Sequence, residues 1–173
     1  MTGGPTEAER AVLDRTRHLD LDHRAMAVAS NIFRVSTAIR RHMERRVLAS
    51  DHLSWTAFVV LWVLWIWGEM ESRDLAAAVG ISKPTSTGVV GTLERRGWVR
   101  RRRGADDGRM VRVSLTATGR RHIERLFPMF NAEETALVSA MTGAEQEALA
   151  GLLRRLLQRV EPTNQLDVRM GGS

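Results

Sequence analysis

The sequence predicts a mainly α-helical protein with a small two-stranded β hairpin. Apolar residues recur every three or four positions over residues 23–48 and 116–160, which is typical of amphipathic helices. Residues 99–115 contain two short segments, and the second, VRVSL, alternates apolar and polar side chains as a strand does. With 173 residues, of which 43% are hydrophobic, the chain is long enough to form one domain with a packed core.

Residues 54–97 are expected to form three consecutive short helices. Ser54 is a suitable N-cap for a very apolar helix that ends at Gly68. A short helix then ends at Gly80, and Ser82 caps the next one, which Gly97 closes. Two short helices joined by a glycine turn, with small and branched apolar residues between them, are typical of a helix-turn-helix.

The positive charge of the chain is concentrated in one segment. The sequence has 26 basic and 20 acidic residues, and every base except Lys83 is an arginine. Residues 94–125 contain eleven arginines and four acidic residues, so the excess charge is local. A local basic surface is typical of a protein that binds a polyanion.

Composition argues against several other classes of protein. The absence of cysteine excludes disulfides and thiolate metal sites. The N-terminus lacks the apolar run of a signal peptide, and the stretch from Trp55 to Gly68 is shorter than the roughly 20 residues that span a bilayer. A cytoplasmic protein without membrane contact is therefore expected. The histidines are scattered and no phosphate loop or nucleophile motif occurs, so no enzyme, metal site or cofactor is predicted.

A helix-turn-helix followed at once by a basic hairpin is a winged helix, and this chain resembles the MarR family of bacterial transcription regulators over residues 23–160. Three blocks carry the resemblance: DLAAAVGISKPTSTGVVGTLERRGWVRR, DGRMVRVSLTATGRR and GAEQEALAGLLRRL. The resemblance implies a homodimer with an all-helical dimerisation region. Each subunit would present one winged helix-turn-helix to double-stranded DNA with a pseudo-palindromic operator.

The resemblance also suggests how the chain is organised. The expected parts are an N-terminal arm (1–22), a MarR-like domain (23–160) and a C-terminal tail (161–173). Within the domain, the winged helix-turn-helix lobe covers residues 54–115, and the dimerisation helices cover residues 23–48 and 116–160.

The N-terminal half of the second helix in such a motif enters the major groove of DNA. This places six residues near base edges and phosphates: Ser82, Lys83, Pro84, Thr85, Ser86 and Thr87. In the hairpin, Arg100, Arg102 and Arg103 are expected to reach the DNA backbone. The Asp-x-Arg wing motif of the family falls on Asp107 and Arg109, which implies that Asp107 orients an Arg109 guanidinium inserted into the minor groove.

Four of the five tryptophans lie on one helix, and the resemblance implies an effector cleft close to it. We expect Trp55, Trp62 and Trp65, with Arg34 and His42 at the mouth, to bind a small aromatic ligand that releases a repressor from DNA. Two alternatives stay open. In the first, the tryptophans only pack the core of an effector-independent or architectural DNA-binding protein. In the second, the chain is a helical protein-interaction module, against which the basic hairpin argues.

Overall fold

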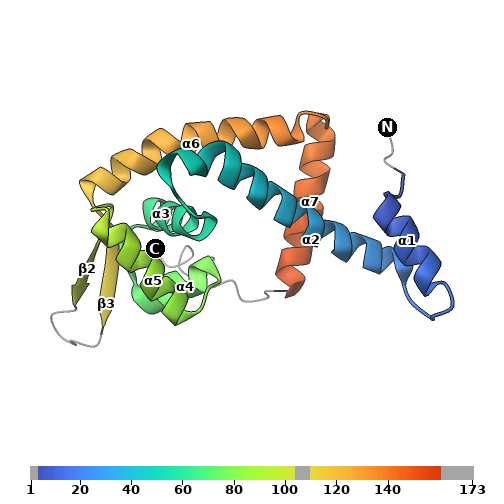
Figure 1. Cartoon of the computed structure of the whole chain (residues 1–173), viewed down its shortest axis with the longest axis horizontal. Coiled ribbons are helices and arrows are strands. Elements are labelled where there is room, and N and C mark those ends of the chain that lie inside the picture. Colours follow the sequence, from blue (N-terminus) through green and yellow to red (C-terminus); the bar gives the residue numbers. More distant parts are fainter. Residues whose placement is uncertain (1–3, 104–109, 161–173) are drawn as a thin grey trace. The chain divides into compact units, whose positions relative to one another are not determined.

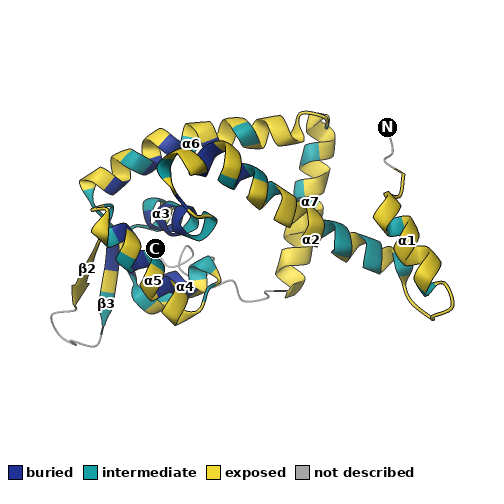
Figure 2. Ribbon diagram, viewed as in Figure 1, coloured by how far each residue is buried: buried dark blue, intermediate teal, exposed yellow. Residues whose placement is uncertain are grey.

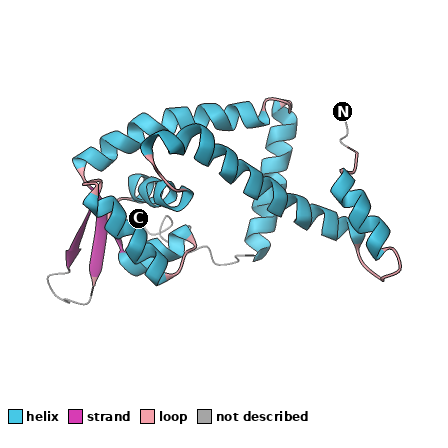
Figure 3. Ribbon diagram, in the orientation of Figure 1, coloured by secondary structure: helices cyan, strands magenta, loops and turns pink. Residues whose placement is uncertain are grey.

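The computed structural model describes residues 4–103 and 110–160. The chain divides into two compact units, residues 1–42 and 43–173. Both are built mainly of helices, and the strands of the described residues form one small sheet that contains the basic hairpin (Figures 1 and 3). The helices are α1 (Glu7–Thr16), α2 (His23–Met43), the π-helical η1 (Glu44–Leu48), the 3-10 helix η2 (Ala49–Asp51), α3 (Trp55–Trp67), α4 (Ser72–Val79), α5 (Lys83–Arg95), α6 (Ala117–Val138) and α7 (Gly143–Val160). The strands are β1 (Met70–Glu71), β2 (Val99–Arg103) and β3 (Val111–Leu115).

The N-terminal unit contains α1 and nearly all of α2. A capping box starts α1, because the Glu9 amide donates to the Thr6 hydroxyl at 3.3 Å and the Thr6 amide donates to the Glu9 carboxylate at 2.7 Å. Asn31 of α2 donates a further bond to Glu9 at 2.8 Å. The segment expected only as an arm therefore contains a helix that is bonded to α2.

The second unit has its core around α3, which packs against α4, α5 and α6 (Figure 1). Large side chains with at most 1% exposure come from all four helices: Leu61, Leu64, Leu75, Leu93, Ile123 and Leu126. Met43 and Leu48, which precede α3, are equally buried. Figure 2 shows many of the buried positions of this unit on these helices. Each such side chain contributes roughly 1.5–3 kcal/mol to the free energy of unfolding, so this core holds the lobe together.

The helix-turn-helix is confirmed. Gly80 ends α4 in a left-handed conformation with φ of 70°, which glycine adopts without steric cost, and the Ile81 amide donates to the Ala76 carbonyl. The Ser82 hydroxyl then caps α5 by accepting from the Thr85 amide at 3.3 Å. Both ends of the turn are thus set by the residues that the sequence indicates.

The sheet has three antiparallel strands in the order β1-β3-β2, so the two-stranded prediction is incomplete. The hairpin itself pairs Val99 with Leu115 and Arg103 with Val111. The additional strand β1 pairs Met70 with Val113 along the other edge of β3. A strand of two residues is too short to show the alternation of apolar and polar side chains in the sequence. It is therefore identified only by its pairing with β3.

The helix predicted over residues 23–48 ends as an α-helix at Met43 and continues as the π turn η1. The Glu44 carboxylate accepts from the Trp55 amide at 3.1 Å, which satisfies one of the free donors at the start of α3. Val47 and Leu48 of the same turn are buried. The π-helix is rare and occurs mostly as a single turn within or at the end of an α-helix, as it does here after α2.

The C-terminal helix α7 begins at a capping box, with the Thr142 amide donating to Glu145 at 2.8 Å and the Glu145 amide to Thr142 at 3.3 Å. None of its residues is buried within the described chain (Figure 2). Its apolar stripe is therefore open in the single subunit. The exposed members are Leu149, Leu152, Leu153, Leu156, Leu157 and Val160.

Within the described residues, no single helix is long and apolar enough to cross a membrane, and one bent pair of segments, 23–51 with 55–67, passes that test by length and composition only.

Candidate nucleic-acid interface

The first turns of α5 present short polar side chains to solvent. Lys83, Pro84, Thr85 and Thr87 are exposed, as is the cap residue Ser82. The Thr87 hydroxyl donates to the Lys83 carbonyl at 2.9 Å, so its methyl group is held in a defined direction. These side chains are short enough to let the helix approach DNA bases. The one cation among them, Lys83, is suited to binding guanine O6 and N7.

Ser86 does not belong to this surface, which corrects its assignment as a DNA contact. Its side chain is 1% exposed, and its hydroxyl has no hydrogen-bond partner among the described residues. The reason is helical spacing: Ser86 lies on the same face of α5 as Val90 and Leu93, which are also buried. A small residue there lets α5 approach the rest of the lobe.

The arginines of the hairpin divide between the two faces of the sheet, because side chains alternate along a strand. Arg100 and Arg102 share a face with their partners Ser114 and Arg112, and Arg100 donates to the Ser114 hydroxyl at 3.0 Å. Arg102 lies directly opposite Arg112. Two like charges at paired positions destabilise a hairpin, and the Glu69 carboxylate, 3.7 Å from the Arg112 guanidinium, offsets part of this repulsion.

Arg101 has a different role from its neighbours. Its guanidinium is ion-paired with Glu94 of α5, and its amide donates to the same carboxylate at 3.2 Å. These hydrogen bonds hold the pKa of the Glu94 carboxyl below its ordinary value. Glu94 therefore ties the hairpin to the C-terminal end of α5, whereas Arg102 and Arg103 have no carboxylate partner within residues 4–103 and 110–160.

A groove of about 490 Å³ lies between the hairpin, α5 and the start of α4. It brings Lys83 and Thr87 together with Arg73 and Arg101, two cations that the sequence analysis did not assign to the site. Arg73 is ion-paired with Glu71 at 2.9 Å, so it is positioned at the edge of the groove. The lining residues are Glu71, Ser72, Arg73, Lys83, Thr87, Val90, Arg101, Met110 and Val111.

Two of the predicted wing contacts, Asp107 and Arg109, lie outside the described residues. Of the predicted residues that the structure describes, Lys83 and Thr87 line the groove beside α5, whereas Arg100 and Arg102 lie on the face of the hairpin opposite to that of Arg101. No cluster of three or more potential metal ligands occurs in the described part of the chain. This arrangement suits the binding of a polyanion through cations and hydroxyl groups.

Comparison with known proteins agrees with this geometry. The sequence profile of the MarR family matches residues 53–111, which cover the helix-turn-helix and most of the hairpin. YwaE of Bacillus subtilis (strain 168), an uncharacterized HTH-type transcriptional regulator, is 41% identical over 143 residues, which cover 83% of this chain and 84% of YwaE. The chain belongs to the MarR family. It is a DNA-binding transcription regulator and not an enzyme.

Other regulators are similar to this chain at lower sequence identity. MprA of Escherichia coli (strain K12), a transcriptional repressor, is 29% identical over 96 residues, which cover 56% of this chain and 54% of MprA. Among solved structures, BpsR of Bordetella bronchiseptica has a TM-score of 0.70 and 26% identity over 75% of this chain and 98% of BpsR. The DNA binding of BpsR is regulated by 6-hydroxynicotinic acid.

The tryptophans predicted to line an effector cleft fall into two groups. Trp55 lies 6.0 Å, between ring centroids, from Phe130 of α6, and Trp65 lies 5.3 Å from Phe127 of the same helix. Trp62 instead makes an edge-to-face contact with Trp67 at 5.4 Å. All four rings are half-buried, so each keeps some accessible surface. The three predicted residues thus present two separate aromatic surfaces of α3.

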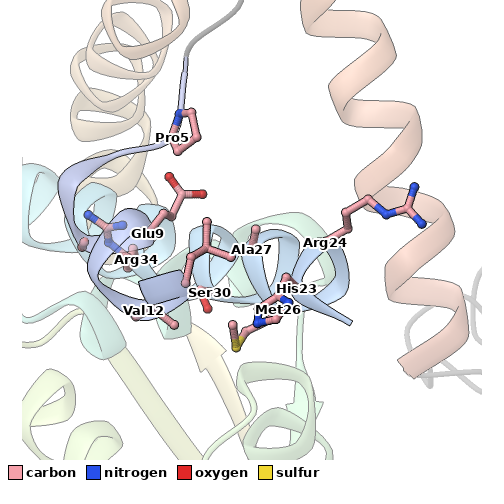
Figure 4. A pocket seen from close by; sticks show the side chains of 11 residues that line it. Pro5, Glu9, Val12, His23, Arg24, Met26, Ala27, Ser30 and Arg34 are labelled. Carbon is pink, nitrogen blue, oxygen red and sulfur yellow. The ribbon is translucent and has the colours of Figure 1, made fainter. Parts of the chain in front are cut away.

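Arg34 and His42, the other two predicted ligand contacts, belong to the N-terminal unit. Arg34 donates to the Thr6 hydroxyl at 3.1 Å and lines a cavity of about 430 Å³ between α1 and α2. Figure 4 shows Arg34 and Glu9 at one end of this cavity and His23 and Met26 at the other. The site that combines them with the tryptophans stays a prediction.

Proposed function

We propose that this MarR-family regulator is a homodimeric repressor that binds a pseudo-palindromic operator and is released by a small aromatic ligand. The observation that carries the DNA contacts is the exposed first half of α5 beside hairpin arginines that have no carboxylate partner in the described chain. A helix of about 10–12 Å diameter fits a major groove about 12 Å wide. Lys83, Pro84, Thr85 and Thr87 then face the bases, and Arg100, Arg102 and Arg103 face the backbone.

The proposal of a dimer is supported by apolar side chains that a single subunit leaves in water. On α7 the exposed fractions reach 58% for Leu152 and 70% for Val160, and on α2 they reach 73% for Phe33. Exposed apolar surface of this extent marks an interaction site. A second copy of the same chain is the partner we propose, since two-fold related subunits suit an operator of two half-sites.

The repressor and ligand parts of the proposal are supported by relatives. MprA is a repressor, and the DNA binding of BpsR responds to 6-hydroxynicotinic acid, a flat aromatic acid. Half-buried indole rings on α3 suit the stacking of such a ring. A ligand of this kind lowers DNA affinity only if it prefers one conformation of the dimer over the other.

The DNA contacts are tested first. The protein is expected to select, from genomic DNA, duplexes with half-sites about one helical turn apart. Lys83→Ala should cost about 1–3 kcal/mol of binding free energy and change the preference among variants of the selected duplex, because one base contact is lost. Arg102→Ala should weaken all duplexes alike. Fluorescence anisotropy titrations measure both effects.

The control for these variants is Arg154→Ala, which removes one arginine from α7, outside the lobe. It should leave the affinity for DNA unchanged. The logarithm of the affinity of the unaltered protein should fall with the logarithm of salt concentration by about 0.9 per phosphate neutralised. Salt-independent binding, or an equal effect of Lys83→Ala on every duplex, would contradict the assignment.

The ligand part has its own test. Salicylate-like acids and larger aromatic compounds are expected to quench tryptophan fluorescence and to weaken binding to the selected duplex at the same concentrations. Trp62→Leu should weaken both responses together, whereas Trp62→Phe, which keeps an aromatic ring, should retain most of each. Quenching without a loss of DNA affinity would indicate an unrelated site. No response to any compound would favour the effector-independent regulator.

A further inference from the structure

The turn around η2 is bonded to the end of α5, although Asp51 precedes Arg96 by 45 residues in the sequence. Arg96, the residue that ends α5, donates from Nη1 to the Asp51 carbonyl at 2.8 Å and from Nη2 to the His52 carbonyl at 3.0 Å. Arg96 lies in the basic segment of the sequence. Its guanidinium is nevertheless occupied by two carbonyls of the same subunit, which distinguishes it from Arg102 and Arg103.

The same turn is bonded to α6 through a side chain. The Asp51 carboxylate accepts from Arg125 Nη2 at 3.0 and 3.2 Å, and its Oδ2 lies 3.6 Å from Nε2 of His122. The side chain of His122 is 9% exposed and that of Asp51 is 18% exposed. One residue, Asp51, therefore joins α5 through its carbonyl and α6 through its carboxylate.

Trp98 fills the space between these two helices. The His122 ring stacks on it at 3.9 Å with an interplanar angle of 16°, and the Arg96 guanidinium lies 5.0 Å from its ring centroid. Its carbonyl accepts from the Thr116 amide, immediately before α6, at 3.0 Å. The connection from α5 into the hairpin is thus held against the start of α6.

The backbone of the turn also indicates a constrained position. His52 has φ of 49° and ψ of 41°, and it is the one non-glycine residue with positive φ among residues 4–103 and 110–160. A histidine in the left-handed region persists where its surroundings hold it. Here the Arg96 guanidinium holds its carbonyl, and its amide donates to the Ala49 carbonyl at 3.1 Å.

We propose that Arg96 and Asp51 are positioning residues for DNA binding, which fix the direction of α5 and the hairpin relative to α6 without touching DNA. This proposal rests on the proposed role of α5 in reading the operator. A carboxylate is repelled by phosphates, and the Arg96 guanidinium is already bonded, so neither group is suited to a direct contact. Their effect is on the geometry of the surface that makes the contacts.

The first test uses Arg96→Lys, which keeps the positive charge but loses the planar pair of donors that reaches both carbonyls. The affinity for the duplex selected by the unaltered protein should fall roughly ten-fold, the equivalent of one charge-assisted hydrogen bond. The affinity for a scrambled duplex of equal length should change by less than about two-fold, since the charge is unchanged. Arg102→Ala is the comparison, because it should weaken binding to both duplexes.

The second test uses Asp51→Asn, which keeps the carbonyl and the shape of the side chain but removes its charge. Burial holds the pKa of His122 below its ordinary value; the Asp51 carboxylate raises it, and Arg125 and Arg96 lower it further. In Asp51→Asn the titration midpoint of the His122 ring, followed by NMR, should therefore move to lower pH. The ratio of affinities for the selected and scrambled duplexes should fall as it does in Arg96→Lys.

The burial of His122 also predicts how the free energy of unfolding changes with pH. Because the folded protein resists protonation of His122 and the unfolded chain does not, the unfolded state binds more protons below the ordinary histidine pKa. The free energy of unfolding should therefore fall as the pH is lowered from about 7.5 to about 5.5, and His122→Asn should flatten this slope.

Three results would overturn the proposal. These are an unchanged affinity of Arg96→Lys and Asp51→Asn for the selected duplex, an equal loss on both duplexes, and an unmoved titration of His122 in Asp51→Asn. A loss of structure in one variant, seen by circular dichroism, leaves the other variant to decide. If the unaltered protein itself fails to prefer any duplex, the proposed function fails, which is distinct from a failure of these variants.

Discussion

Gly119→Ala is expected to lower the free energy of unfolding by about 3 kcal/mol, the upper end of the usual cost of overpacking. An added Cβ at this position would lie 1.9 Å from the carbonyl oxygen of Trp98 and 2.7 Å from its carbonyl carbon. Both are backbone atoms, so they cannot move aside as a side chain does. The start of α6 or the turn at Trp98 must shift, and the Thr116 bonds to that turn would be strained.

The measurement is urea denaturation followed by circular dichroism. Alanine is favoured over glycine in a helix by about 1 kcal/mol, so Gly88→Ala, in α5, is a suitable control. Among the described residues, no atom beyond the adjacent backbone of α5 lies within 4 Å of an added Cβ at Gly88, and this variant should be unchanged or more stable. If Gly119→Ala were as stable as the unaltered protein, the close approach of α6 to Trp98 would be wrong.

Leu152→Glu combined with Leu156→Glu is expected to convert the protein to a monomer and to lower operator affinity by about 10²–10⁴-fold, the usual gain from two linked binding modules. The two leucines are one helical turn apart on α7, with exposed fractions of 58% and 41%. Burying four carboxylates in a two-fold interface is strongly unfavourable. Because neither leucine is buried within the subunit, the lobe should stay folded.

Light scattering measures the mass in solution, and thermal unfolding checks the lobe. The control is Gln158→Glu, which adds a charge to α7 away from the leucine stripe and should leave the dimer intact. A double variant that remains dimeric would place the dimer interface elsewhere. A monomeric variant that retains full operator affinity would instead contradict the need for two linked recognition helices.

The sequence by itself determined the order and most boundaries of the elements that build the lobe. Ser54, Ser82 and Thr116 each cap a helix through their own hydroxyl, and Gly80 ends α4. These signals act within about four residues along the chain, so they can be recognised in the sequence without any knowledge of how the helices pack. The local excess of arginine likewise predicts a polyanion-binding surface, because charge is additive over a short segment.

Only the tertiary structure decided which polar residues face outward and which pairs meet. Helix packing buried Ser86 among exposed hydroxyl residues, and strand pairing revealed β1. The arginines of the basic segment also differ in their contacts. Arg101 is ion-paired with Glu94, and Arg96 donates to the turn at Asp51, whereas Arg102 has no carboxylate partner in the described chain. Positions 51 and 96 lie 45 residues apart, and no periodicity connects them, because such contacts depend on where whole helices pack rather than on neighbouring residues.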